Sequence, residues 1–203
     1  DNREDFFSVG TSRDFWNGRD AAADNWPFMV LTAAMTDRPI FEGRMREILG
    51  SGASVLVGYS LGGRLASRAA LRSPGAFSAV VLVGSTAGLE EGPMRVHRAE
   101  ADEKLASWIE AMPIEDIVSL WERQPLFADQ SDALVEAQRP GRLSQDQRSL
   151  ALLLRTAGQG ALEPVWHELS QLELPVLAIA GARDDGYSRA ARRIASTAPK
   201  GRT

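Results

Sequence analysis

A chain of 203 residues with 44% hydrophobic content can bury one sizeable core, so we expect one domain with an insertion rather than two separate domains. The net charge of -4 is mild and the arginines are scattered among acidic residues, which argues against a nucleic-acid partner. No apolar run approaches a membrane span and no secretory leader opens the chain, and the absence of cysteine fits the cytoplasm, where we expect the protein.

The first third of the chain predicts an alternation of strands and helices. Residues 1–27 are polar and lack a clear period, so we expect mostly loop there. The apolar run 28–33 predicts a buried strand, and the helical spacing of apolar side chains over 39–49 predicts a helix. Further strands are expected at 53–57 and 76–84, with a helix at 61–72 between them. This rhythm predicts a right-handed parallel sheet.

The sequence Gly58-Tyr59-Ser60-Leu61-Gly62 joins one of these strands to the next helix. A serine in such a turn takes a strained backbone conformation that exposes its Oγ, and small residues two positions away on either side leave room for the turn. The start of the following helix directs its free N–H groups at the same place, so the Leu61 amide is a candidate oxyanion donor. We therefore predict a nucleophile elbow at Ser60; the alternative is a chance Gly-x-Ser-x-Gly turn.

Residues 85–173 hold no convincing strand and predict a helical cap inserted over the sheet. Its expected helices are separated by prolines. They span residues 93–111, 114–123, 130–138, 144–157 and 160–171. A strand at 174–180 and a helix at 187–197 then return to the core. The predicted class is α/β, with an incomplete core from 1–84 and 174–203 and a cap from 85–173.

Asp184 follows the last predicted strand in a Gly-x-x-Asp turn, at the edge of the sheet where ligands bind in such folds. We predict Asp184 as the acid of a triad and consider that Asp185 better fits the alternative role of a helix cap. Both histidines, His97 and His167, precede the acid, whereas the base of an α/β hydrolase should follow it. We expect them to be surface or cap-packing residues, and the sequence to be truncated before its base or to be a degenerate homologue.

Four stretches together resemble one family, the MenH-type 2-succinyl-6-hydroxy-2,4-cyclohexadiene-1-carboxylate synthases of menaquinone biosynthesis, which have the α/β-hydrolase fold. They are Gly58–Arg64, Trp121–Phe127, Arg142–Asp146 and Gly181–Asp184. The narrower signals are the Trp-x-x-x-Pro-Leu-Phe run in the cap and an arginine four residues past the serine. The family's His-Gly oxyanion loop has no counterpart near the start of the chain, so the second oxyanion donor is unassigned.

The resemblance implies a lyase without a cofactor. Such an enzyme removes a proton beside the succinyl carbonyl of 2-succinyl-5-enolpyruvyl-6-hydroxy-3-cyclohexene-1-carboxylate, and pyruvate is eliminated. By analogy, Ser60, made basic by a histidine and Asp184, takes the proton while the Leu61 amide stabilises the enolate. The three substrate carboxylates need cationic partners. The positions that match the family's substrate-binding residues are Arg64, Arg98 and Arg142, with Arg139 as the fallback for Arg142, and the pocket is lined by Trp121 and Tyr59.

Each of these assignments has a simpler alternative. An arginine can be a solvated charge on a helix face, and Trp121 can simply pack the cap. For the whole protein, a serine esterase or C–C bond hydrolase and a catalytically silent binding protein stay open beside the synthase. We expect no metal site, since two separated histidines and no thiols make no recognisable ligand set.

Overall fold

The computed structural model describes residues 54–128 and 130–203. Within them, four strands form one parallel sheet in the order β1-β2-β3-β4. The strands are β1 (Ser54–Tyr59), β2 (Phe77–Val83), β3 (Val176–Ile179) and β4 (Gly201–Arg202). The parallel sheet predicted from the strand pattern is confirmed, although the two-residue β4 is too short to leave such a pattern. The strand expected at 28–33 and the helix expected at 39–49 lie outside the described residues.

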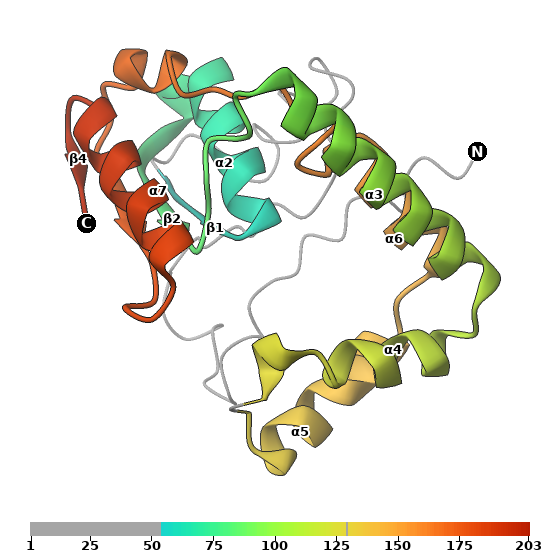
Figure 1. Cartoon of the computed structure of the whole chain (residues 1–203). Coiled ribbons are helices and arrows are strands. Elements are labelled where there is room, and N and C mark those ends of the chain that lie inside the picture. Colours follow the sequence, from blue (N-terminus) through green and yellow to red (C-terminus); the bar gives the residue numbers. More distant parts are fainter. Residues whose placement is uncertain (1–53, 129) are drawn as a thin grey trace. The chain divides into compact units, whose positions relative to one another are not determined.

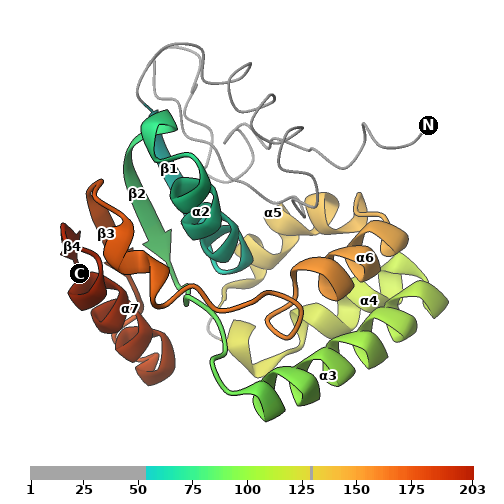
Figure 2. The same ribbon diagram turned by 90° about the horizontal axis from the view of Figure 1, so that it is seen from above.

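Two helices lie against this sheet, α2 (Leu61–Arg72) along β1 and β2, and α7 (Asp185–Thr197) along β3 and β4 (Figure 2). The α2 helix has the predicted bounds, and the turn at Ser73 with the 3-10 helix η2 (Pro74–Ala76) ends it. Its small apolar residues, such as Ala66, Ala69 and Ala70, are fully buried, which lets the helix approach the strands closely.

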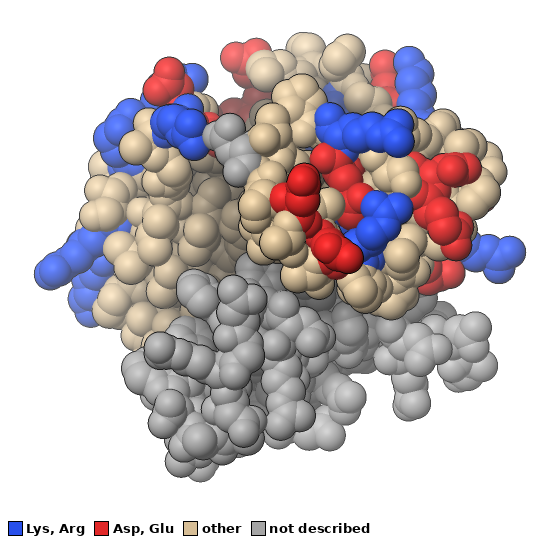
Figure 3. Space-filling model, turned by 90° about the horizontal axis from the view of Figure 1, so that it is seen from below, with Lys and Arg blue, Asp and Glu red and all other residues tan. Residues whose placement is uncertain are grey.

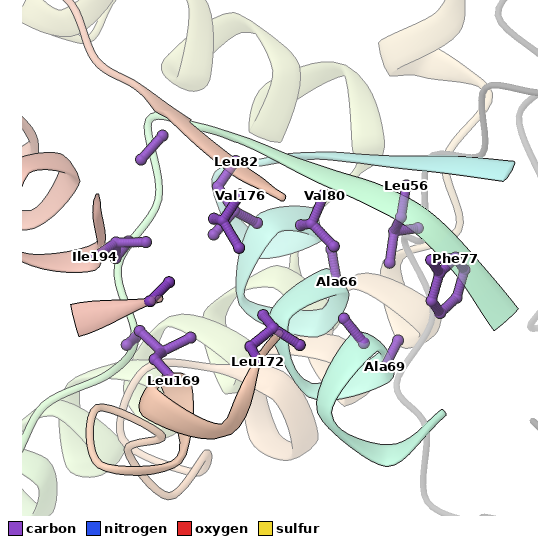
Figure 4. Close-up of a cluster of buried hydrophobic side chains, with 14 of the residues drawn as sticks. Leu56, Ala66, Ala69, Phe77, Val80, Leu82, Leu169, Leu172, Val176 and Ile194 are labelled. Atoms are coloured by element: carbon purple, nitrogen blue, oxygen red, sulfur yellow. The ribbon is translucent and has the colours of Figure 1, made fainter. Parts of the chain in front are cut away.

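The core lies between the sheet and these helices (Figure 4). Leu56, Val80 and Leu82 point from β1 and β2 toward α2, and Val176 of β3 points the same way. Strand side chains alternate between the two faces, so Leu177 and Ile179 of β3 face away from these helices and are exposed. On the strands β2 to β4, the residues 79–81, 175–177 and 199–202 line an open apolar groove, which contains none of the predicted site residues.

The chain divides into two compact units, one holding residues 54–90 and 162–203 and the other residues 91–161 (Figure 1). Within its described residues, the second unit contains four α-helices and the 3-10 helix η3 (Pro125–Phe127). Those helices are α3 (Gly92–Ala111), α4 (Ile114–Glu122), α5 (Asp132–Leu143) and α6 (Gln147–Ala157). A small apolar core formed by Ala106, Ile109, Ile117 and Ala151 holds α3, α4 and α6 together.

Two predicted helices differ from the structure by more than three residues at one end or are absent. The prediction of a helix at 160–171 is wrong. Only the 3-10 helix η4 (Glu168–Gln171) forms there, after a series of turns. Pro164 cannot donate a helical hydrogen bond, while Trp166 and Leu169 are buried in the core of the first unit. The helix expected to end at 138 instead continues through Pro140 to Leu143.

Candidate active site

Ser60 stands at the carboxyl end of β1 with φ 50° and ψ -113°, and it is the only non-glycine residue with positive φ in the described chain. Such a conformation costs free energy and is kept where the surroundings impose it. The Ser60 N–H donates to the Val83 carbonyl of β2 at 2.9 Å, which fixes the turn to the neighbouring strand. Its side chain makes no capping hydrogen bond to α2. The strained turn predicted for a nucleophile elbow is therefore present.

Gly58 leaves the space that this turn needs. A Cβ built there would lie 2.4 Å from the Gly62 carbonyl oxygen and 2.6 Å from Gly63 Cα. Gly63 is equally crowded, since its Cβ would lie 2.5 Å from Ser85 Oγ. Ser85 is buried and donates through Oγ to the Ser60 carbonyl oxygen at 3.0 Å. Ser85 was not predicted from the sequence, where its only signal is its place directly after the apolar strand and Gly84.

The backbone N–H groups at the amino end of α2 lie close to Ser60. The N–H groups of Gly63 and Arg64 donate to the Ser60 carbonyl oxygen. Among residues 54–128 and 130–203, nothing accepts from the Leu61 N–H, which belongs to the first residue of the helix. A free N–H at the positive end of a helix can stabilise a developing negative charge. This geometry supports Leu61 as the oxyanion donor.

Arg64 lies one helical turn beyond Ser60 and is 6% exposed. The alternative of a solvated charge on the helix face is therefore wrong for this residue, because α2 packs its side chain into the unit. Arg68, one turn further, donates through Nη1 to the Arg64 carbonyl oxygen at 3.3 Å. Burial lowers the pKa of the Arg68 guanidinium to about 10, and the charges of Arg64 and Arg72 contribute to this shift. The α2 helix thus carries three positive charges, Arg64, Arg68 and Arg72, on the turns that follow Ser60.

Asp184 lies at the same edge of the sheet as Ser60. Tyr59 of β1 pairs with Val83, and Val83 pairs with Ile179 of β3, so the loops after β1 and β3 leave the sheet at one end. The Asp184 side chain accepts from the Tyr187 N–H at 2.9 Å and caps α7. The prediction that Asp185 takes the capping role is wrong, because Asp185 is already the first residue of the helix. A carboxylate accepts several hydrogen bonds, so the cap leaves room for an imidazole partner.

Tyr59 and the two histidines are all exposed. Tyr59 is 57% exposed beside Ser60, and a Cβ built at Gly84 would lie 3.4 Å from its ring. His97 on α3 and His167 before η4 are both exposed, as expected for surface residues. Neither histidine is assigned as the base.

In the second unit, Trp121, Arg142 and Arg139 form one cluster around Glu122. Arg142 donates to Glu122 Oε1 at 2.9 Å and to Gln138 Oε1 at 2.6 Å, and Arg139 donates to Glu122 Oε2. The Arg142 guanidinium lies 5.8 Å from the centre of the Phe127 ring, which packs tilted against Trp121 at 5.6 Å. Two arginines share one buried carboxylate, so the cluster keeps a net positive charge.

Arg98 lies on α3 and donates through Nε to Asp102 Oδ1 at 2.8 Å. The structure thus brings Tyr59, Ser60, Leu61 and Arg64 together in the first unit, with Asp184 at the same sheet edge. Trp121 and Arg142 lie together in the second unit. Both cap arginines are paired with buried carboxylates, although the Arg98 side chain is itself 42% exposed.

Figure 3 shows Lys and Arg side chains interspersed with Asp and Glu on the face that it presents. No three His, Asp or Glu side chains gather as a metal-binding group in the part of the chain that the structure describes. Over the same residues, no helix combines the length and the apolar character needed to span a membrane.

Comparison with known proteins relates these features to a family. The family described as alpha/beta hydrolase fold matches residues 32–195. A protein of Bacillus subtilis (strain 168) named "Putative 2-succinyl-6-hydroxy-2,4-cyclohexadiene-1-carboxylate synthase" is 34% identical over 150 residues, which cover 72% of this chain and 55% of that protein. The 2-succinyl-6-hydroxy-2,4-cyclohexadiene-1-carboxylate synthase of Salmonella paratyphi B (strain ATCC BAA-1250 / SPB7) is 29% identical over 142 residues, covering 70% and 56%.

Among solved structures, MenH from S. aureus superimposes with a TM-score of 0.72 at 26% identity, over 81% of this chain and 62% of that one. The chain spans about half the length of the curated relatives that it matches. These comparisons confirm the resemblance drawn from the sequence motifs.

Proposed function

Because this chain belongs to the alpha/beta hydrolase fold family, we propose that the protein uses Ser60 as the base of a pyruvate-eliminating lyase of the 2-succinyl-6-hydroxy-2,4-cyclohexadiene-1-carboxylate synthase type. Two neighbouring features carry this proposal. Ser60 has a strained backbone and a side chain that makes no capping hydrogen bond to α2, and the buried Arg64 follows it by one helical turn. An ester hydrolase needs the serine but has no need of a buried cation beside it. The names of the matched relatives support the same activity.

In the proposed reaction, Ser60 Oγ takes the proton from the carbon beside the succinyl carbonyl of the enolpyruvyl substrate. The electron pair of the broken C–H bond moves to the carbonyl oxygen, which becomes an enolate beside the Leu61 N–H. The enolate then returns its electrons, and the bond from the ring carbon to the enolpyruvyl oxygen breaks. The leaving group departs as the enolate of pyruvate and accepts one proton to become pyruvate, which balances the proton removed at Ser60. Asp184 orients the imidazole that the resemblance implies as the partner of Ser60.

The substrate is a small tricarboxylate, which gives the arginines a physical task. A guanidinium stays charged at all physiological pH values and pairs with a carboxylate through two parallel hydrogen bonds. We propose Arg64, Arg98 and Arg142 as the carboxylate-binding residues, with Trp121 and Tyr59 lining the pocket. The reaction would take place in the cytoplasm, which fits a sequence without cysteine.

The test supplies the intact protein with the enolpyruvyl substrate and, separately, with a p-nitrophenyl ester. We expect pyruvate release without ester cleavage. Ser60→Ala should lower kcat by roughly 10²- to 10⁴-fold, the usual contribution of a general base. Arg64→Ala should raise KM, whereas Arg72→Ala, which removes an exposed arginine at the other end of α2, should leave both constants unchanged.

The alternatives give different results in the same experiment. Ester cleavage without pyruvate release would identify a serine hydrolase. No turnover of either compound, even with tight substrate binding, would identify a silent binding protein. An unchanged KM in Arg64→Ala would remove the carboxylate-binding role of that arginine.

A further inference from the structure

Asp102 is a buried acid in the middle of α3 and is 4% exposed. Its Oδ1 accepts from Arg98 Nε at 2.8 Å, and the Arg98 side chain is 42% exposed. Among the described residues, none donates to Asp102 Oδ2, although that atom is also buried. Burying a carboxylate with half of its hydrogen-bonding capacity unused costs free energy, so the residue calls for an explanation beyond packing.

The backbone around Asp102 is shaped to accommodate this side chain. Gly158 follows α6, and a Cβ built on it would lie 2.4 Å from Asp102 Oδ2. The missing side chain therefore provides the room in which the carboxylate sits, between α3 and the end of α6. The α3 and α6 helices also share the small apolar core of this unit. The packing of these two helices therefore holds Asp102 and Gly158 next to each other.

The pair uses only one edge of the Arg98 guanidinium. Nε points at Asp102, while neither Nη group has a hydrogen-bond acceptor in the described part of the chain. An arginine that is anchored through Nε presents its two Nη groups as a fork, and a carboxylate can accept from such a fork through both oxygens. Arg142 differs, because its Nη1 and Nη2 already donate to Glu122 and Gln138.

We propose that Asp102 is a positioning residue that anchors Arg98 through Nε and so holds its Nη fork ready to bind a substrate carboxylate. The proposal rests on the proposed function for the identity of the substrate. Anchoring removes rotamer freedom from a long side chain before the substrate arrives, so less entropy is lost on binding. Asp102 does not contact the substrate in this scheme and acts only through Arg98.

The simpler alternative is an ordinary ion pair between residues four apart on a helix. Such pairs usually join two exposed side chains, contribute little and need no space reserved for them. Here the acid is buried, and a glycine on another segment accommodates it. The two explanations predict different results when Asp102 loses its charge.

The kinetic test compares Asp102→Asn with Glu103→Gln in the intact protein. Asp102→Asn keeps the shape of the side chain but loses the anion, and we expect KM for the enolpyruvyl substrate to rise about tenfold while kcat stays within about twofold. Glu103→Gln removes the neighbouring exposed acid, which pairs with Arg155, and should leave both constants unchanged. An unchanged KM in a folded Asp102→Asn protein would overturn the proposal.

A second measurement does not depend on turnover. In ¹⁵N-arginine-labelled protein, the Arg98 Nε–H, assigned by its loss in Arg98→Lys, should exchange slowly with solvent and should become fast in Asp102→Asn. Titration with succinate as a carboxylate probe should shift this signal in the wild type. A fast-exchanging Nε–H in the wild type, or no response to succinate, would overturn the proposal even if Asp102→Asn does not fold.

The two experiments distinguish failure of the proposed function from failure of the proposed role of Asp102. Absence of pyruvate release by the wild type would end the proposed function. In that case, slow Nε–H exchange that depends on Asp102, together with the succinate response, would still establish the anchored fork.

Discussion

The backbone of α2 approaches β1 closely at Gly58, so a substitution of this residue tests whether the elbow turn is as crowded as the structure shows. A methyl group there would meet the Gly62 carbonyl and Gly63 Cα, which are backbone atoms that cannot rotate away. We expect Gly58→Ala to lower the free energy of unfolding by about 1–3 kcal/mol, the usual cost of overpacking. Gly75→Ala is the matched control in chemical denaturation, because a Cβ built at Gly75 meets no atom within 4 Å. Equal midpoints for both variants would contradict the crowded turn.

Single residues were predictable from sequence where a backbone constraint selects the residue type. The strain at Ser60 and the space at Gly58 follow from the Gly-x-Ser-x-Gly pattern, because few other residues fit such a turn. Ser85 was not predictable, since a serine after a strand has many possible roles and only the fold brings it to the Ser60 carbonyl. The cap of α7 was assigned to the wrong one of Asp184 and Asp185, because adjacent acids give the same capping signal one residue apart.

At the scale of elements, Arg155 on α6 connects to α3 through two acids. It donates to Glu103 at 2.8 and 2.9 Å and to Glu110 at 2.7 and 2.9 Å. These hydrogen bonds hold the pKa values of both glutamates below their ordinary value of 4.5. The stabilisation that the bonds provide is therefore present above pH 4.5 and is lost as the pH falls through the lowered values.

We expect Arg155→Ala to lower the Tm at pH 7, and we expect the difference from the wild type to shrink when the pH is lowered below the depressed glutamate values. High salt at pH 7 should also shrink it, because the three side chains are partly exposed and their charges are screened. Thermal melts of Arg148→Ala provide the control on the same helix, since Arg148 influences Glu110 through its charge without a hydrogen bond and should show a much smaller pH-dependent difference. A Tm difference that is constant with pH would show that Arg155 acts by packing alone.

The elements that sequence reasoning placed well are those with a repeating apolar pattern. The α2, α3 and α4 helices form within a residue or so of the expected bounds, because their periodicity and their flanking prolines or serines agree. Residues 160–171 have a similar apolar content, yet their large side chains fill the core of the first unit from a chain of turns. Tertiary packing decided that segment, and local spacing carries no information about it.

On the scale of the whole molecule, the alternation of strands and helices made the parallel sheet predictable, whereas the boundary of the helical unit depended on long-range contacts. The chain leaves the first unit after Glu90 and returns at Leu162. At this place Trp166 Nε1 donates to the Gly88 carbonyl oxygen at 2.8 Å, and the Arg193 guanidinium lies 4.0 Å from the centre of the Trp166 ring. Three segments that are distant in sequence are thus joined around one indole.

Trp166 is therefore the residue whose loss should separate the stabilities of the two units. Trp166→Ala should cost about 3–5 kcal/mol through the lost core packing, and Trp166→Phe should cost less because it keeps most of the ring but loses the hydrogen bond to Gly88. Hydrogen exchange followed by mass spectrometry should show protection falling in α2, β2 and α7 while α3 and α6 keep theirs, because each unit has its own apolar core. Equal loss of protection in both units would mean that they unfold as one cooperative body.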